Sequence, residues 1–362
     1  MTERIVRSTK PRFQVDGLDV DRLAADLLRL EVWHDEDGMG RLEMRLSNWG
    51  QLNQGDPTGF IYFGGDLMDL GRELVVEAGD AEAAGIIFRG HVTSIQGVFP
   101  EVSAPELVVC AEDELQQLRM RTSTRLFEDS TDRDIAATVA DDHGLSTEGD
   151  PDGPTHVQLM QINQSDLSFI RERAWAVDAR PQIIDGALNF LPKRDDEDTD
   201  PPELSRLKEL VDFRVRVDLA HQRTEVQVHG YSVADKEAII ATATKDDLSA
   251  ENLDGGRTGP EVLEDLDWTA VDHRHIEVPS TQEEADHLAK AILKERARNF
   301  VHGEGTTKGT PTMRIGQVLQ LNDLGDWFSG KYYVSSLRHS WDGRVGMRTY
   351  FEAQRVDLGE AG

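Results

Sequence analysis

Apolar and polar residues alternate strictly in two short runs near the start of the chain. The first run covers residues 28–32, the second covers residues 42–46, and the segment HDEDGMG separates them. A period of two on both arms predicts a β-hairpin with one buried face. Gly, Asp and Pro bound further apolar segments, which predict strands at 60–64, 72–78, 86–98 and 105–110. We therefore expect an antiparallel β-domain over residues 11–110.

The pattern changes to that of helices in the middle of the chain. Thr131 and Asp134 form a capping signal, and Gly144 is a stop signal for the helix that follows. A second helix is expected to start at Ser165 and to end before Pro181. The segment RPQIIDGALNFLP (180–192) predicts two short strands. Residues 111–192 should form a small α+β lobe, followed by a solvated acidic linker, KRDDEDTDPPE (193–203).

Alternation returns in the second half of the chain. Residues 212–219 and 225–228 have the same period of two on either side of AHQR, which predicts a second hairpin. A capping box of Thr281 and Glu284 precedes an apolar stripe and predicts a helix over 281–300. Two long strands are expected near the C-terminus.

Two distant segments resemble each other. IIFRGHVTSIQGVF (86–99) and WFSGKYYVSSLRHSW (327–341) both contain F-x-G followed by V-[TS]-S-[IL]. The spacing between the two parts differs by two residues, which keeps the same side chains on the same face of a strand. This predicts a distant duplication, and the fold class is α+β, mainly β, with two related antiparallel β-barrel domains. The expected domains are residues 1–110, an inserted lobe with its linker at 111–205, and a second barrel at 206–362 with the helix near 281–300 inserted in it.

The charge balance limits the partners. The chain has 68 acidic and 39 basic residues, a net charge of -29, which opposes affinity for phosphate backbones. Sequence-specific nucleic-acid binding is therefore not expected. The acidic residues include 39 Asp, whereas only 9 residues are Lys. This mix is typical of a halophilic protein, and an acidic surface of an ordinary large assembly remains the alternative.

The sequence contains neither a disulfide framework nor a membrane signal. Cys110 is the single cysteine and lies in an apolar run, so a buried thiol is expected. The N-terminal segment lacks the apolar core of a signal peptide, and no run of residues reaches the length of a membrane span. We expect synthesis in the cytoplasm, no membrane anchor, and any exit by another route.

Several segments contain residue types found in functional sites, but their order or their position in the predicted elements does not match such a site. GEGTTKGT (303–310) has the glycines of a phosphate loop, but its order is Lys-Gly-Thr and it precedes a strand, so a flexible connector is expected. His273 and His275 share one face of a strand, but the sequence shows no third ligand at a diagnostic spacing. Asp141, Asp142 and His143 end a helix.

Two further features have ordinary explanations. The sequon at 163–165 overlaps the expected N-cap Ser165, and the six tryptophans are scattered, which is typical of core or interface positions. We predict no catalytic, cofactor-binding or metal-binding residue, no cofactor, and no enzyme activity.

The order of the segments resembles the tail-hub family, that is, the late control protein D of contractile phage tails and the hub part of the valine-glycine-repeat spike proteins of type VI secretion. The resemblance rests on four segments, which together span roughly residues 85–350. They are FRGHVTSIQ, TRLFEDSTDRDIAATVADDHGL, QSDLSFIRERAWAVDARPQIIDGALNF and GTPTMRIGQVLQLNDLGDWFSGKYYVSSLRHSW.

The resemblance implies a baseplate hub that acts as a symmetry adapter. In that family three chains with two similar barrels each form a ring, which joins a hexameric inner tube to a trimeric spike. The implied partners are two further copies of the chain, the tube protein, the spike protein, and baseplate wedge or adaptor proteins. The protein would then be a component of a phage tail or of an injection particle, including a particle that is released outside the cell. A tail-associated cell-wall or polysaccharide hydrolase and a monomeric binding adaptor remain as alternatives.

Overall fold

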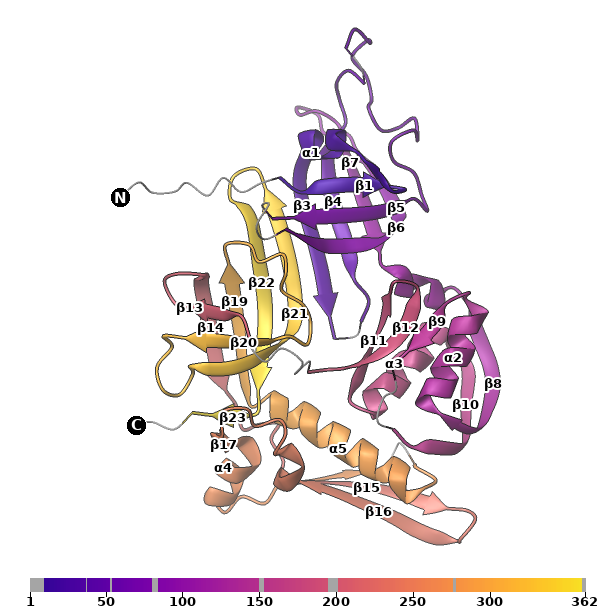
Figure 1. The fold of residues 1–362 in the computed structure, drawn as a ribbon, viewed down its shortest axis with the longest axis vertical. Coiled ribbons are helices and arrows are strands. Elements are labelled where there is room, and N and C mark those ends of the chain that lie inside the picture. Colours follow the sequence, from indigo (N-terminus) through magenta and orange to yellow (C-terminus); the bar gives the residue numbers. More distant parts are fainter. Residues whose placement is uncertain are drawn as a thin grey trace.

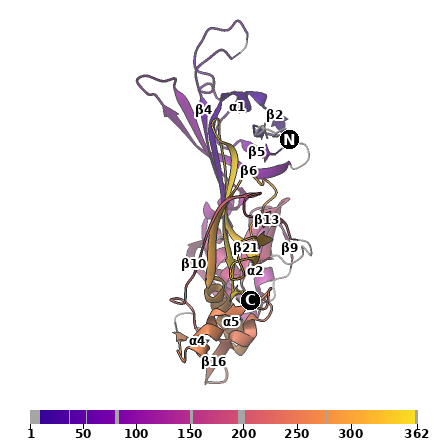
Figure 2. The same cartoon turned by 90° about the vertical axis from the view of Figure 1, so that its left-hand side faces the viewer.

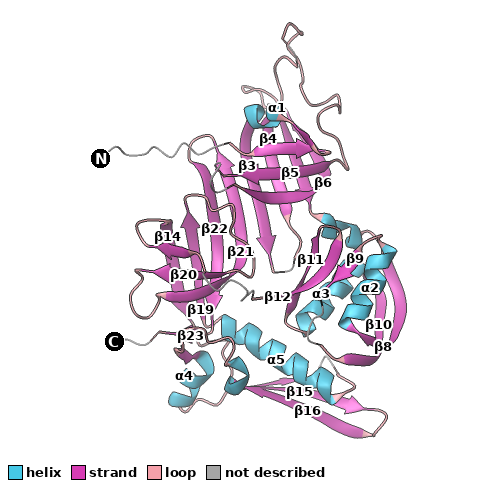
Figure 3. Cartoon of the chain, viewed as in Figure 1, coloured by secondary structure: helices cyan, strands magenta, loops and turns pink. Residues whose placement is uncertain are grey.

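The computed structural model describes residues 10–36, 38–52, 54–79, 84–149, 153–194, 201–275 and 278–359. Buried hydrophobic residues gather in four cores, two of them in β-modules, one in a lobe and one beneath the long helix α5 (Gln282–Arg298). Antiparallel strands predominate (Figures 1 and 3), which confirms the prediction of an α+β, mainly β fold. No described helix is long and apolar enough to cross a membrane.

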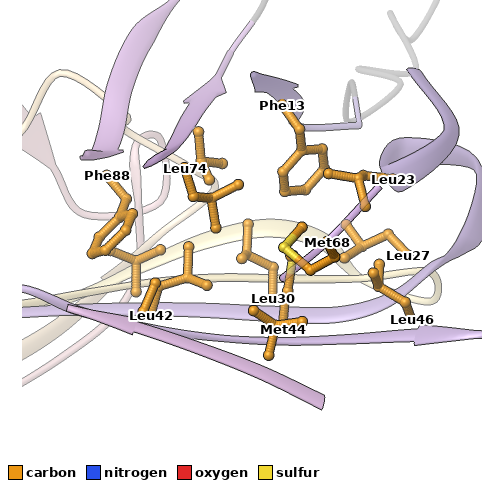
Figure 4. Packing of buried hydrophobic residues seen from close by; sticks show 14 of the residues in the cluster. Phe13, Leu23, Leu27, Leu30, Leu42, Met44, Leu46, Met68, Leu74 and Phe88 are labelled. Carbon is orange, nitrogen blue, oxygen red and sulfur yellow. The ribbon is translucent and has the colours of Figure 1, made fainter. Parts of the chain in front are cut away.

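The first module contains a short helix and seven strands around one core. Leu30, Leu42, Met44 and Leu74 converge in this core (Figure 4). The elements are β1 (Arg12–Val15), β2 (Leu18–Asp19), α1 (Asp21–Asp26), β3 (Leu27–Asp35), β4 (Arg41–Ser47), β5 (Glu73–Ala78), β6 (Gly85–Val98) and β7 (Glu106–Glu112). The predicted hairpin of 28–32 and 42–46 is β3 and β4. Leu28 nevertheless faces solvent, because a register shift between Leu27 and Arg29 interrupts the alternation.

The second module contains the C-terminal strands and two strands that precede a long insertion. Its strands are β13 (Glu203–Ser205), β14 (Leu210–Val217), β19 (Val301–Thr307), β20 (Val318–Asn322), β21 (Gly330–Asp342) and β22 (Gly346–Arg355). Figure 2 shows the strands of the two modules following one another along the long axis of the molecule.

The two modules have the same order of strands. In the first, neighbouring strands run β3, β4, β7, β6, β5, β1, and in the second they run β14, β19, β22, β21, β20, β13. Only the last pair differs in direction, since β1 is antiparallel to β5 whereas β13 is parallel to β20. The predicted duplication therefore has a counterpart in the hydrogen-bonded order of the sheet.

The backbone repeats in detail as well. The Val92 amide donates to the Arg72 carbonyl at 2.9 Å, and the Gly71 amide donates to the Val92 carbonyl at 2.8 Å. Val334 makes the same two bonds with Gln317 and Gly316, at 2.9 and 2.8 Å. A register shift directly follows each valine, between Val92 and Ser94 and between Val334 and Ser336. V-[TS]-S is thus a bulge motif that occurs at the same place in both modules.

The F-x-G part of the sequence repeat is not structurally equivalent. Gly90 lies opposite Leu74, the second residue of β5, whereas Gly330 lies opposite Leu321, the fourth residue of β20. The two glycines are therefore offset by two positions, as the unequal spacing in the sequence implies. The real partner of the V-[TS]-S motif is a second short repeat, Gly-[Arg/Gln]-x-Leu, at 71–74 and 316–319.

The inserted lobe agrees closely with its predicted elements. It contains η1 (Glu114–Arg119), β8 (Thr122–Thr131), α2 (Asp132–Asp142), β9 (Ser146–Glu148), β10 (Thr155–Ser165), α3 (Asp166–Ala176), β11 (Ala179–Ile184) and β12 (Ala187–Pro192). The capping box of Thr131 and Asp134 begins α2, and Ser165 caps α3, as predicted. The second helix ends earlier than expected, because Asp178 takes a positive φ of 56° and Pro181 already lies within β11.

A second insertion replaces the turn between β14 and β19. It consists of β15 (Glu225–Ser232), β16 (Glu237–Thr244), η2 (Lys245–Leu248), β17 (Arg257–Thr258), α4 (Gly259–Asp265), β18 (Val271–Arg274) and α5 (Gln282–Arg298), and β17 pairs with the C-terminal β23 (Asp357–Leu358). The predicted capping box of Thr281 and Glu284 begins α5, and the predicted apolar stripe of this helix is buried.

The second predicted hairpin is wrong. β14 pairs with β19, whereas β15 pairs with β16 and β18 in a separate three-stranded sheet that α5 covers. Both segments form strands as predicted, but they do not pair with each other. A long insertion separates β14 from its true partner, and short-range patterns contain no information about such a pairing.

The predicted flexible connector GEGTTKGT is also wrong. Its first five residues belong to β19, which lies between β14 and β22. Gly303 and Gly305 leave room for aromatic rings, because a Cβ at Gly303 would lie 2.2 Å from Phe213 and one at Gly305 would lie 2.4 Å from Phe351. These glycines serve close packing rather than flexibility.

Two smaller predictions also need correction. Residues 60–64 form turns rather than a strand, and the Asn48 side chain accepts hydrogen bonds from the Ile61 and Tyr62 amides. Within the predicted solvated linker, Lys193 and Arg194 are instead largely covered, and Arg194 pairs with Glu251. Residues 195–200 of that linker lie outside the described residues.

Candidate assembly interface

The two modules are joined within the chain by one antiparallel strand pair. The C-terminal half of β21 pairs with β3, from Ser336 opposite Asp35 to Asp342 opposite Arg29. Trp341 lies opposite Leu30, is 4% exposed and belongs to the core of the first module. The strand of one module therefore inserts its last aromatic side chain into the core of the other. We call this strand pair the intrachain joint.

Two buried histidines lie in the intrachain joint. His339 is opposite Val32, and His34 is opposite Leu337. Burial lowers the pKa of His339 to about 3, and the nearby His34 adds to the effect. Burial also lowers the pKa of His34, whose Nε2 lies 2.9 Å from the Ile87 carbonyl oxygen. Both rings are neutral at neutral pH, so the intrachain joint contains no buried positive charge from them.

Charged side chains form a ladder across the solvent face of the joined sheet. Arg338 pairs with Glu31 across the joint at 3.0 Å and lies over the Tyr350 ring at 4.0 Å. The ladder continues to either side through His302 with Glu352, Arg29 with Glu31, Arg45 with Glu43, and Arg45 with Glu106. Paired polar side chains therefore line this face in both modules.

Two strand edges that correspond to the intrachain joint have no strand partner among the described residues. β14 is the last strand of the sheet path at one end, and it is the counterpart of β3. β6 pairs with β5 only up to His91 and with β7 from His91 onward, so its edge beyond the Val92 bonds to Gly71 and Arg72 is unpaired. That segment is the counterpart of the half of β21 that pairs with β3. Unpaired edges of this kind are templates for pairing with another chain.

An exposed aromatic cluster lies beside the open edge of β6. Phe99 follows β6 directly and is 65% exposed. Its ring contacts Phe60 at 6.1 Å and Phe63 at 5.6 Å between centroids, and Trp49 adds an edge contact with Phe60 at 5.3 Å. All four rings are more than two-fifths exposed. A cluster of exposed aromatic side chains is typical of an interaction surface.

Polar contacts, some buried and one exposed, fix the inserted lobe to α5. Arg298 is almost fully covered and donates to Asp178 of the lobe at 2.5 and 2.7 Å and to Glu251 at 2.9 and 3.0 Å. His156 Nδ1 lies 2.7 Å from Glu284 Oε1, and Trp175 donates to Glu295 at 3.0 Å. These contacts hold the lobe at one position relative to the second module.

Two cavities lie at this junction between the lobe and α5. One, of about 480 Å³, is lined by basic residues that include Lys193, Lys294 and Arg298. Asp178 and Glu251 lie in the same wall and pair with Lys294 and Arg298. The cationic groups are thus largely occupied in holding the lobe to α5.

The sequence-predicted histidine pair has a third neighbour that the sequence did not reveal. His229 of β15 lies beside β18, with its Nε2 3.4 Å from His273 Nδ1 and its ring stacked on His275 at 4.3 Å. Among the described residues, no group of three or more His, Cys, Asp or Glu is arranged to hold a metal ion. The His275 ring is stacked with the rings of His229 and His273, whereas the His229 and His273 rings are tilted by 39° to each other.

The remaining candidates have structural roles. His143 Nε2 lies 2.9 Å from Asp166 Oδ2 of α3, and Arg125 of β8 pairs with Asp142 at 2.7 Å, so the end of α2 is tied to both α3 and β8. Ser165 accepts a hydrogen bond from the Ser168 amide as the N-cap of α3. Cys110 is half-buried in β7, and burial raises the pKa of its thiol, which makes it less reactive.

Solved structures with this fold are phage tail proteins. The 43 kDa tail protein of prophage MuSo2 from Shewanella oneidensis has a TM-score of 0.68 at 14% identity, over 96% of this chain and 99% of that one. The tail protein from Neisseria meningitidis has a TM-score of 0.66 at 14% identity, over 96% of each chain. These likenesses show that the chain has the fold of phage tail proteins.

A third solved structure extends the fold to a secretion system. The E. coli c3393 protein, described as a component of the type VI secretion system with structural similarity to the T4 tail proteins gp27 and gp5, has a TM-score of 0.58 at 12% identity. The match covers 97% of this chain and 79% of that one. No curated protein matches the chain in sequence.

A family model matches most of the sequence. It is that of the Alg8 N-terminal domain, and it covers residues 59–342. The matched region runs from Gly59, just before Phe60 of the aromatic cluster, through the lobe and the second insertion to the end of β21. The chain therefore belongs to the Alg8 N-terminal domain family.

Proposed function

We propose that the chain is a structural hub of a contractile tail or injection system. Three copies would form a ring that joins a hexameric inner tube on one side to a trimeric central spike on the other, with wedge or adaptor proteins around it. This is the role implied by the resemblance to late control protein D. It requires no active site, cofactor or metal ion, and we propose none.

One observation carries the proposal: the two modules have the same strand order. A ring that must match six tube subunits with three chains needs two similar surfaces per chain. The repeat of the Val92 and Val334 backbone bonds, each followed by a bulge, gives the two modules similar edges at the same place. Similar backbone edges are sufficient for such a match, even where the side chains differ.

The intrachain joint is compatible with a ring. It is heterologous, because the β21 edge of one module meets the β3 edge of the other. A heterologous contact repeated between copies closes into a ring when its rotation permits and otherwise continues as a filament. A ring of three chains has six modules and uses this kind of contact six times.

The mass of the purified protein tests the proposal. One chain is 40.5 kDa, so the ring should have about three times that mass by light scattering, and the value should persist on dilution to micromolar protein. A mass of one chain under the same conditions would favour the monomeric adaptor. Digestion of peptidoglycan or polysaccharide by the purified ring would favour the hydrolase instead.

A further inference from the structure

We propose that the open edge of β6 in one copy pairs with β14 of the next copy, antiparallel and with Gly97 opposite Val215. This inference rests on the proposed ring and specifies the joint that closes it. In the ring, the intrachain joint and this intercopy joint would alternate. Main-chain pairing at a strand edge is a general mode of protein association.

The register on the β6 side follows from the repeated valine bonds. Val92 and Val334 occupy equivalent positions, and each precedes a bulge that ends at a serine. Ser94 therefore corresponds to Ser336. Counting onward along both strands, Gly97 corresponds to His339 and Phe99 corresponds to Trp341.

The register on the β14 side follows from the strands that lie between β6 and β3 in the first module and between β21 and β14 in the second. In the first module, Val92 is opposite Ala111, Ala111 is opposite Leu42, and Leu42 is opposite Val32. In the second module, the same path from Val334 runs through Ala353 and Gly303 to Val215. Val215 thus corresponds to Val32. Since His339 pairs with Val32 within the chain, Gly97 should pair with Val215 of the neighbouring copy.

The side chains on the inner face of this pairing are complementary. It places Ile95 opposite Val217 and Phe99 opposite Phe213. The corresponding pairs within the chain are Leu337 with His34 and Trp341 with Leu30. Phe213 already packs against the core of the second module. Phe99, which is 65% exposed in one chain, would enter that core as Trp341 enters the core of the first module.

Features of the outer face and of the chain end limit unwanted pairing of the β6 and β14 edges before assembly. The pairing sets Gln96 opposite Arg216 and Val98 opposite Arg214. In the intrachain joint, Arg338 and Ser340 occupy the positions that correspond to Gln96 and Val98. Arg214 and Arg216 project from the exposed edge strand β14. Charged side chains on an edge strand discourage pairing with wrong partners. Pro100, which has no amide hydrogen, ends the available edge of β6 directly after Phe99.

Engineered disulfides test this register directly. Directly opposite residues of antiparallel strands have Cα atoms about 4.5–5.5 Å apart, which suits a disulfide. We would introduce Gln96→Cys with Arg216→Cys in a Cys110→Ser background and oxidise the protein mildly. The inferred joint predicts covalent dimers and trimers on denaturing gels, because the two new cysteines lie on different copies.

Two variants serve as controls. Trp33→Cys with Arg338→Cys, the corresponding pair of the intrachain joint, should give a disulfide within one chain and no covalent oligomer. Gln96→Cys with Asp212→Cys uses the same face of β14 four residues away, which is too far for a disulfide in the inferred register.

Light scattering of the reduced protein separates the two proposals. A trimer whose 96–216 pair cross-links supports both the ring and the joint. A trimer that cross-links at 96–212, or at neither pair while the intrachain control forms, would overturn the joint and leave the ring standing. A reduced protein with the mass of one chain would contradict the ring itself.

Discussion

Trp341 of β21 lies directly opposite Leu30 of β3, so the second module contributes an aromatic side chain to the core of the first. The two modules are therefore not independent domains. They share one sheet, and their relative orientation is set by backbone pairing and by this side chain.

The first prediction concerns this side chain. Trp341→Ala should lower the free energy of unfolding by about 3–5 kcal/mol, because it removes a large buried ring and leaves a cavity between the modules. Urea denaturation of the purified protein measures this. A loss of under about 1 kcal/mol would mean that Trp341 does not hold the modules together.

The second prediction concerns its counterpart. Phe99→Ser should leave the unfolding free energy of one chain within about 0.5 kcal/mol, because Phe99 is mostly exposed there. It should weaken the trimer at least tenfold in a dilution series followed by light scattering. Val102→Ser is a matched control, since Val102 is 95% exposed but does not belong to the aromatic cluster. Equal effects of the two substitutions on assembly would contradict the assigned role of Phe99.

The third prediction concerns the glycines of β19. Gly305→Ala should destabilise the protein by about 1–3 kcal/mol, because the new Cβ would lie 2.4 Å from the Phe351 ring. Gly343→Ala, with nothing within 4 Å of its Cβ, should change stability by under about 0.5 kcal/mol. Thermal melting of both variants compares them. A harmless Gly305→Ala would show that the strand can move away from Phe351.

The fourth prediction concerns pH. The pKa of His339 is lowered to about 3 in the fold, whereas an unfolded histidine titrates near about 6.5. Between these two pKa values the unfolded chain binds more protons at His339 than the folded chain does. The contribution of neutral His339 to the free energy of unfolding is therefore fully present above pH of about 6.5 and is lost as the pH falls toward about 3. Urea midpoints should therefore decline from pH 7.5 to pH 5.

The control for this pH effect is His339→Gln, which cannot titrate. The variant should lose less stability over the same pH range than the parent protein does. Parallel curves for the two proteins would show that protonation of His339 does not contribute. His34 remains in both proteins and should preserve part of the decline.

The fifth prediction concerns the attachment of the lobe. Arg298→Met should cost about 3–5 kcal/mol, because it leaves the buried carboxylates of Asp178 and Glu251 without their main partner. Arg257→Met removes an exposed pair with Asp265 and should have little effect. Hydrogen exchange should rise in α3 and β11 only in the first variant. Unchanged hydrogen exchange in the lobe would mean that the other contacts are sufficient to hold the lobe to α5.

Local chemistry made much of the fold predictable from the sequence. The capping boxes at Thr131 and Thr281 each involve residues only three positions apart, and the helices begin there as expected. The alternation in 28–46 likewise specified which side chains of β4 enter the core. Each of these signals lies within one element.

Long-range pairing accounts for the errors. Nothing near β14 in the sequence indicates β19 as its partner, because the two arms of that hairpin are separated by the α5 insertion. The glycines of β19 also lack strand propensity, and their role depends on Phe213 and Phe351 from other strands. The intercopy edges were missed for the same reason, since the equivalence of Phe99 and Trp341 emerges only from the strand order.

Electron microscopy of the assembled particle at near-atomic resolution tests the central claim most directly. The account predicts a ring of three chains and six modules, in which sheet continuity alternates between β21–β3 within a chain and β6–β14 between chains. A ring with another number of chains, or one in which only one module of each chain faces the inner tube, would contradict it.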